Sequence, residues 1–344
     1  MEDLNPKSNS YLLGQDEAQK IFLDAWKNNS LHNSWLISGV SGIGKATFAY
    51  KVARFLLSVD ETKKQNYDNL DINGEQTVFR QVANASHPDL KIIERGYSET
   101  DKRKIIKAIK DGKPLEEEDL KEFKKSTNIK IDEVREIKEF LSKKSADGNW
   151  RIVIVDSVDE MNIASANAIL KVLEEPPHKT IMLLISHNPN KLLPTIKSRC
   201  AKLALKPLEE NEVASLLRRY RPEVTEKDVK EAAKLSGGSI GRAISYVDFD
   251  ALALYESLCK IVYAKSNFQI EDLLNFCNKA TAGEEEYNLA KELVLKFISE
   301  NVLNSPALTE VWDTTLETFS ETDRLNMDKK QALTKVIINI SKVI

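Results

Sequence analysis

The pattern of hydrophobic and polar positions is clearest between residues 150 and 200. A continuous apolar, β-branched run at 152–155 predicts a strand that is buried on both faces and therefore parallel to its neighbours. Apolar residues then recur at helical spacing from 166 to 173, and Asn162 precedes them as the expected N-cap. A second apolar strand is expected at 181–185. This succession of strand, helix and strand indicates an α/β fold with a parallel sheet.

An earlier part of the chain shows a related pattern with a glycine-rich connection. A short strand is expected at 35–38, and an amphipathic helix follows the segment that ends in Lys45. Strand, glycine-rich loop and helix are the context that a phosphate-binding P-loop requires, because backbone N–H groups and the helix dipole then face the phosphate. The candidate nucleotide-binding residues of this segment are Gly39, Gly42, Gly44, Lys45, Ala46 and Thr47.

One position of this loop departs from the P-loop pattern. Ala46 follows the lysine, where a Ser or Thr hydroxyl normally binds Mg²⁺. Thr47 lies about 100° further around the helix and is not expected to replace that hydroxyl. ATP is therefore the expected ligand, but its binding is left open and no metal site is predicted. Asp156, directly after the 152–155 strand, is a further candidate because open α/β sheets bind ligands at the carboxyl ends of strands.

Three segments in a fixed order carry a family resemblance. They are the end of a helix at 170–177, the strand at 182–186, and Ser198-Arg199-Cys200. Together they resemble the clamp-loader branch of the AAA+ ATPases, and the chain as a whole resembles the delta prime subunits of the bacterial DNA polymerase III clamp loader. The resemblance covers roughly residues 10–58 and 129–245. Beyond residue 250 only the expected helical architecture is similar.

The resemblance implies roles for several residues. Active AAA+ enzymes have a Glu after the strand-ending Asp to polarise the attacking water, whereas Asp156 is followed by Ser157. Together with Ala46 this implies an ATPase fold that does not hydrolyse ATP. Arg242 matches the arginine of the helical lid that reaches bound phosphates, and the alternative is an arginine on the surface of a helix. Arg199 is expected to act in trans on the ATP of a neighbouring subunit, and the alternative is a structural arginine paired with an acid of its own domain.

Cysteine content bears on metal binding. Delta prime subunits usually carry a four-cysteine zinc module before a His-Pro-Asp segment, but this chain has no cysteine before Cys200. No zinc is therefore expected, and His87 is expected to be a turn residue ahead of a strand because a lone histidine is weak support for a metal site. Cys200, Cys259 and Cys277 show no C-x-x-C spacing and are expected to be reduced.

The resemblance and the helical patterns together predict three domains. Residues 1–207 form a RecA-like AAA+ domain, in which 96–125 is a charged insertion at the surface. Residues 208–248 form a helical lid, and 249–344 form an all-α collar that assembles the ring. A basic DNA-contacting hairpin is the alternative for the insertion, and the adjacent acidic run at 116–119 argues against it.

Composition excludes several classes of protein. The 344 residues carry a net charge of −3, without the basic excess that is usual in a DNA-binding protein acting alone. No apolar run reaches the length of a membrane span, and the polar N-terminus does not resemble a signal peptide. A cytoplasmic protein that does not contact a membrane is the expected class.

The resemblance implies a function. It predicts a non-motor subunit of the DNA polymerase III holoenzyme, a DNA-directed DNA polymerase and thus a nucleotidyltransferase complex. The expected partners are gamma/tau-type ATPase subunits and a delta-type subunit in a hetero-pentamer, the sliding clamp, and primed DNA through the complex. Two alternatives are left open: an ATP-hydrolysing motor subunit of the same loader, favoured by the intact residues 39–45, and a scaffold that binds no nucleotide.

Overall fold

Contacts between Cα atoms divide the chain into two compact units. A computed structural model describes residues 4–111, 123–143, 145 and 150–344 of the protein. The first unit comprises residues 1–213 together with 238–241, and the second comprises 214–237 and 242–344. The predicted division into three domains stays a prediction beside this two-part division.

The first unit is built on a parallel sheet whose order is β2-β3-β4-β1-β5. Its strands are β1 (Ser34–Ser38), β2 (Leu90–Ile93), β3 (Arg151–Val155), β4 (Thr180–Ser186) and β5 (Ala201–Ala204). Every residue of β3 and β4 is buried, which explains their uninterrupted apolar sequences. The predicted α/β class with a parallel sheet is confirmed.

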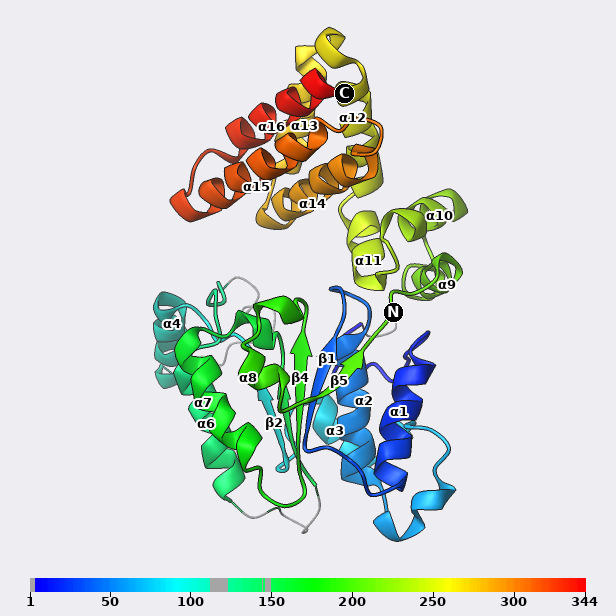
Figure 1. The fold of residues 1–344 in the computed structure, drawn as a ribbon, viewed down its shortest axis with the longest axis vertical. Helices are drawn as coiled ribbons and strands as arrows, with labels where there is room; N and C mark the ends of the chain where they lie inside the picture. The colour runs from blue at the N-terminus through cyan, green and yellow to red at the C-terminus, as the bar shows by residue number, and fades with distance from the viewer. Residues whose placement is uncertain (1–3, 112–122, 144, 146–149) are drawn as a thin grey trace. The chain divides into compact units, whose positions relative to one another are not determined.

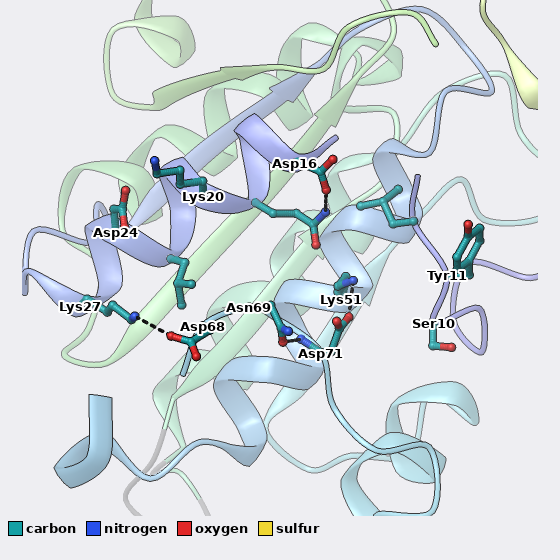
Figure 2. Close-up of a pocket in the computed structure, with 13 residues that line it drawn as sticks. Ser10, Tyr11, Asp16, Lys20, Asp24, Lys27, Lys51, Asp68, Asn69 and Asp71 are labelled. Carbon is teal, nitrogen blue, oxygen red and sulfur yellow. Dashed lines mark hydrogen bonds and ion pairs between the residues drawn. The ribbon is translucent and has the colours of Figure 1, made fainter. Parts of the chain in front are cut away.

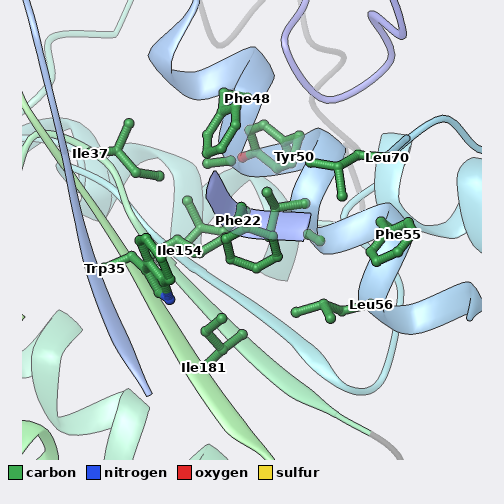
Figure 3. Close-up of a cluster of buried hydrophobic side chains, with 14 of the residues drawn as sticks. Phe22, Trp35, Ile37, Phe48, Tyr50, Phe55, Leu56, Leu70, Ile154 and Ile181 are labelled. Atoms are coloured by element: carbon green, nitrogen blue, oxygen red, sulfur yellow. The ribbon is translucent and has the colours of Figure 1, made fainter. Parts of the chain in front are cut away.

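Helices cover both faces of the sheet, as Figure 1 shows. The helices of this unit are α1 (Asp16–Lys27), α2 (Lys45–Ser58), α3 (Thr77–Ala83), α4 (Glu99–Lys110), α6 (Ile131–Ser142), α7 (Ile163–Glu174) and α8 (Pro194–Lys197). Alternate strand residues point to opposite faces. Ile154 thus joins the core beneath α1 and α2 (Figure 3), whereas Val153 and Val155 join the core beneath α6 and α7.

The ends of α7 follow the sequence signals. The Asn162 side chain accepts a hydrogen bond from the Ser165 N–H, which confirms the predicted N-cap. Glu160 lies before this helix and not in its first turn. It ends a short 3₁₀ turn, Val158–Glu160, and its carboxylate pairs with Arg95 (Nε to Oε2, 2.9 Å).

The segment that follows α2 is held by aromatic packing. Trp26, Phe55 and Tyr67 form mutual edge contacts with ring centroids 4.9–5.6 Å apart. The only helix-like turn between α2 and α3 among the described residues is a 3₁₀ segment, Glu61–Asn66. His87 accepts the Asp89 N–H at Nδ1 (3.1 Å) just before β2, consistent with a turn residue. Within the described ranges no cluster of potential ligands suits a metal ion.

The charged insertion contains the helix α4 and is closed at its base by backbone hydrogen bonds. Ser98 N donates to Lys124 O (2.8 Å), and Ser126 N donates to Gly96 O (2.7 Å). The acidic run at 116–119 lies outside the described residues.

The second unit is entirely helical among its described residues. Its helices are the end of α9 (Glu210–Tyr220), α10 (Glu226–Leu235), most of α11 (Ile240–Asp248), α12 (Ala251–Tyr263), α13 (Ile270–Ala280), α14 (Glu284–Asn301), α15 (Leu308–Leu325) and α16 (Lys329–Val343). Phe276, Phe297 and Ile337 are among its buried side chains. The predicted all-α C-terminal region is confirmed. In the described part of the chain, none of the helices combines the length and apolar character needed to cross a bilayer.

Candidate functional site

The glycine-rich loop joins the carboxyl end of β1 to the N-terminus of α2, as predicted. Gly44 is the N-cap of α2 and has a left-handed backbone (φ 96°) that favours glycine. Gly42 is also left-handed (φ 77°). The residues therefore adopt a P-loop-like connection in which α2 begins at Lys45.

The Lys45 side chain turns back onto its own loop. It is 3% exposed, and its Nζ donates to the carbonyls of Gly39 (2.7 Å) and Val40 (2.6 Å). Burial lowers the pKa of Lys45 to about 8, although the nearby carboxylates of Asp156 and Asp159 act in the opposite direction. The ammonium that would meet a phosphate is thus satisfied by backbone oxygens.

A distant segment of the same unit lies against the loop. The Ser239 hydroxyl donates to Ser41 O (2.8 Å), and Gly241 N donates to Gly42 O (3.0 Å). The fit is close enough that a Cβ on Gly42 would lie 2.9 Å from the Cα of Gly241. Residues 238–241 therefore cover this side of the P-loop.

The position after the lysine is apolar in structure as well as in sequence. Ala46 packs against the core beneath α1 and α2, and Thr47 is buried. The expectation that this loop has no substitute for the Mg²⁺-binding hydroxyl stays a prediction.

Asp156 and its neighbours occupy the carboxyl edge of the sheet. The Ser157 hydroxyl lies 3.4 Å from Asp156 Oδ1 and 3.1 Å from His187 Nε2, and the Ser157 backbone is left-handed (φ 60°). Asp159 accepts the backbone N–H groups of His187 and Asn188. Burial, with a smaller contribution from Lys45, lowers the pKa of His187. Ser157 and His187 thus form a hydroxyl–imidazole contact beside Asp156.

The segment before α1 is tied to the region that precedes α9. Gln15 donates through its side-chain amide to Lys206 O (2.9 Å), and Gly14 has a left-handed backbone (φ 72°) close to Leu208. These contacts join residues 14–15 to residues 206–208 within the first unit.

Arg242 belongs to the second unit. Its Nε lies 2.8 Å from Glu292 Oε1 on α14, and the same carboxylate oxygen accepts a hydrogen bond from the Tyr246 hydroxyl. These contacts lie within the helical unit. The predicted phosphate contact of Arg242 stays a prediction.

Arg199 lies at the opposite edge of the sheet from the P-loop. It directly precedes Cys200 and β5, whereas the P-loop follows the carboxyl end of the neighbouring parallel strand β1. A strand of five residues spans roughly 16 Å. Arg199 Nη2 pairs with Glu174 Oε1 (2.6 Å), and Nη1 donates to Thr195 O (3.0 Å). The structure therefore does not bring Arg199 to the nucleotide loop of its own chain.

A charged cavity of about 540 Å³ lies along α1 and α2, outside the predicted site (Figure 2). None of residues 39–47 lines it. Its charges are partly paired, with Lys51 at 2.5 Å from Asp71 and Lys27 at 4.0 Å from Asp68. Acids and bases alternate along the lining, so the cavity offers no convergent set of donors to a phosphate.

A comparison with known families decides the identity of the fold. The family described as "DNA polymerase III, delta subunit" matches residues 14–209, which contain the P-loop, Asp156 and Arg199. The chain belongs to this family. Delta prime proteins of DNA polymerase III are among its relatives.

Individual relatives agree with this assignment. The DNA polymerase III subunit delta' of Pseudomonas aeruginosa is 34% identical over 209 residues, which are 60% of this chain and 53% of that protein. The subunit tau/gamma of Haemophilus influenzae is 28% identical over 71% of this chain and 31% of its own length. The chain thus spans about half or less of these relatives. A solved gamma subunit-related protein from Thermotoga maritima covers 94% of this chain and 99% of its own, at 19% identity and a TM-score of 0.47.

Some residues at these sites did not emerge from the sequence patterns. Ser239 and Gly241 follow a glycine pair that indicated only a helix break, and their contact with the P-loop has no local signal. Glu174 lies in the segment 170–177, which carried the resemblance. Its pairing with Arg199 was not predicted, and the only hint in the sequence was an acidic residue close to a proline pair. His187 directly follows β4, and no spacing in the sequence marks its contact with Ser157.

Proposed function

We propose that this chain is the non-motor, delta prime-type subunit of a DNA polymerase III clamp loader. In this proposal it joins gamma/tau-type ATPase subunits and a delta-type subunit in a hetero-pentamer in the cytoplasm. The complex loads the sliding clamp onto primed DNA, and this subunit supplies Arg199 to the ATP of its neighbour. ATP binding at its own P-loop is weak or absent.

The observation that carries the proposal is the separation of Arg199 from the P-loop. A guanidinium at the amino edge of the sheet serves no purpose for a phosphate at the carboxyl edge of the same domain, but it is available to a subunit that packs against that edge. An arginine suits this task because it is planar, permanently charged, and able to fork onto phosphate oxygens.

The alternative of a motor subunit has one specific observation in its favour. The match to tau/gamma extends over 71% of this chain, and the glycine-rich loop is intact. Ala46 and Ser157 oppose it, since they remove the metal-binding hydroxyl and the carboxylate that prepares water. The hydrogen bonds from Lys45 to the carbonyls of Gly39 and Val40 also oppose rapid exchange of nucleotide.

The test of the proposal is Arg199→Ala in a loader reconstituted with gamma/tau-type and delta-type subunits. We expect normal assembly and a reduced DNA-stimulated ATPase. An arginine finger contributes about 10³–10⁵ in rate, but a ring with several sites loses only the share of one interface. Arg199→Lys is expected to restore little, because a point charge does not reproduce the fork.

The matched control is Arg218→Ala. Arg218 is also a partly exposed arginine that pairs with a carboxylate, that of Glu226, but it lies on α9. It is expected to leave the ATPase unchanged. Full ATPase and clamp-loading rates in the Arg199→Ala complex would support the structural alternative. In that case Arg199 would serve only to pair with Glu174 of its own domain.

A further inference from the structure

The helix α4 of the charged insertion carries an array of cations that the proposed function does not use. Five of its 12 residues are basic and exposed, namely Lys102, Arg103, Lys104, Lys107 and Lys110. Lys104 pairs with Asp101 of the first turn (Nζ to Oδ1, 2.7 Å). The other four cations form no ion pair or hydrogen bond with any residue that the structure describes. They are therefore available to an anionic partner.

Two isoleucines lie on the same side of α4 as these four cations. Ile106 is 44% exposed and Ile109 is 65% exposed, although isoleucine is among the residues most often buried in proteins. At 3.6 residues per turn, an arc of about 160° around the helix holds both isoleucines and the four cations. In order around this arc, which we call the exposed face of α4, they are Ile109, Lys102, Ile106, Lys110, Arg103 and Lys107.

The opposite side of α4 attaches the helix to the first unit. Asp101, the one buried residue of α4, accepts hydrogen bonds from the Ser98 hydroxyl (3.0 Å) and from Lys124 N (3.1 Å). In Figure 1, α4 lies at the margin of this unit. Because the helix is held from its inward side, substitutions on the exposed face of α4 should leave the fold intact.

The chemistry of this face favours an acidic protein segment over a nucleic acid or a membrane. A phosphate backbone would pair with the cations but would offer no apolar surface to Ile106 and Ile109. The nearby rings of Tyr97 and Phe123 pack edge to face against each other, with centroids 6.3 Å apart, and are not displayed for stacking on bases. A membrane surface requires a broader apolar stripe than two isoleucines. Carboxylates together with apolar side chains complement the whole face.

We propose that the exposed face of α4 binds an acidic segment of a partner protein in which apolar side chains lie among carboxylates. The carboxylates pair with the four cations, and the apolar side chains bury Ile106 and Ile109. The helix belongs to the first unit, whereas ring assembly is expected of residues 251–344 in the second. The site is therefore separate from ring assembly, and the inference does not rest on the proposed function.

The experiment uses the full-length chain and a fluorescein-labelled synthetic peptide in which leucines recur at helical spacing among glutamates. Fluorescence anisotropy is expected to give a dissociation constant on the order of 10 µM. Arg103→Glu with Lys107→Glu should weaken binding by about 10-fold or more, because repulsion replaces attraction. Ile106→Gln with Ile109→Gln should weaken it by about 5-fold, because the leucines of the peptide lose their apolar contact. Unchanged melting temperatures would show that each variant is folded.

The matched control is Lys230→Glu with Lys234→Glu on α10. These lysines are also exposed and four positions apart. Every residue of α10 is described, and none of them is an exposed large apolar residue. The two double charge reversals change the net charge equally, so a general effect of charge would weaken both variants alike. We expect the α10 variant to bind the peptide as the wild type does.

Several outcomes would overturn the inference. Equal loss of binding in the α4 and α10 charge variants would show that only net charge matters. A peptide with serine in place of leucine that binds as tightly as the parent would exclude the apolar contact, and this arm needs no change in the protein. Displacement of the peptide by oligothymidylate that binds equally well to the isoleucine variant would indicate a nucleic-acid site. Peptide binding that appears only after the acids of residues 116–119 are changed to amides would make the chain its own partner.

Discussion

At the scale of residues, we expect Ala46 and Ser157 to decide whether the P-loop supports hydrolysis. In this interpretation Ala46 lacks the hydroxyl that binds the metal ion, and Ser157 lacks the carboxylate that prepares the attacking water. We expect the isolated protein to show no ATPase activity, and either Ala46→Thr or Ser157→Glu alone to create no good enzyme because both groups serve the same step. Phosphate release in the presence of Mg²⁺ and ATP measures this. Steady turnover by the wild type that disappears in Lys45→Ala would contradict the prediction.

Lys45 gives a second prediction at this scale, concerning stability. Burial holds its pKa at about 8, whereas a lysine in an unfolded chain titrates near 10.4. Between these values the unfolded chain binds a proton that the folded chain has lost, so stability rises with pH across the interval. We expect the free energy of unfolding of the wild type, relative to Lys45→Met, to rise by about 3 kcal/mol from pH 7.5 to pH 11.

Denaturant unfolding at several pH values provides this measurement. The comparison with Lys45→Met cancels the other titrating groups, which both proteins share. A difference that stays flat or falls with rising pH would mean that the ammonium is solvated, in conflict with its contacts to Gly39 and Val40.

At the scale of elements, the contact of residues 238–241 with the P-loop depends on the absence of side chains. Gly42 has φ of 77°, and a Cβ there would meet the Cα of Gly241 at 2.9 Å. We expect Gly42→Ala to destabilise the first unit by roughly 1–3 kcal/mol, because both backbone strain and overpacking oppose it. Urea unfolding, with hydrogen exchange of the α2 amides, measures the effect.

Gly74→Ala is the matched control for this substitution. Gly74 has open space within 4 Å of the added atom. Its effect should stay within about 0.5 kcal/mol, as for an ordinary surface change. Equal losses of unfolding free energy in the two variants would show that residues 238–241 do not pack tightly against the P-loop.

At the scale of the whole molecule, we expect residues 251–344 to carry ring assembly. A truncation near Val247 is a direct test but an imperfect one, because it removes Glu292, the partner of Arg242 and Tyr246. A surface change is cleaner. Ile270 (71% exposed) and Leu274 (54% exposed) lie one turn apart on α13, and a durable interface needs such apolar area.

We therefore expect Ile270→Glu with Leu274→Glu to abolish co-elution with gamma/tau-type subunits in size-exclusion chromatography, while the isolated chain stays folded. Ile109→Glu, at a comparably exposed isoleucine of α4 (65%), is the control and should assemble normally. Normal assembly of the α13 double variant would remove this face from the collar interface.

The sequence by itself determined the parallel α/β class, three strands of the sheet, the P-loop connection and the all-α C-terminal region. The strands at 152–155 and 181–185, observed as Arg151–Val155 and Thr180–Ser186, were predictable because burial on both faces demands an unbroken apolar run. The loop at Gly42 and Gly44 was readable because left-handed backbone favours glycine. These signals are local, so each is contained in a few consecutive residues.

Only the tertiary structure decided how the site residues are partnered. The Ser239 side chain donates a hydrogen bond to Ser41, which is 198 positions away in the chain. Arg199 forms an ion pair with Glu174 of α7, and Arg242 forms one with Glu292 of α14. Lys45 turns toward its own carbonyls because the loop is covered and a buried ammonium must be satisfied. Such pairings depend on which elements the fold brings together, and no hydrophobic period or residue spacing encodes them.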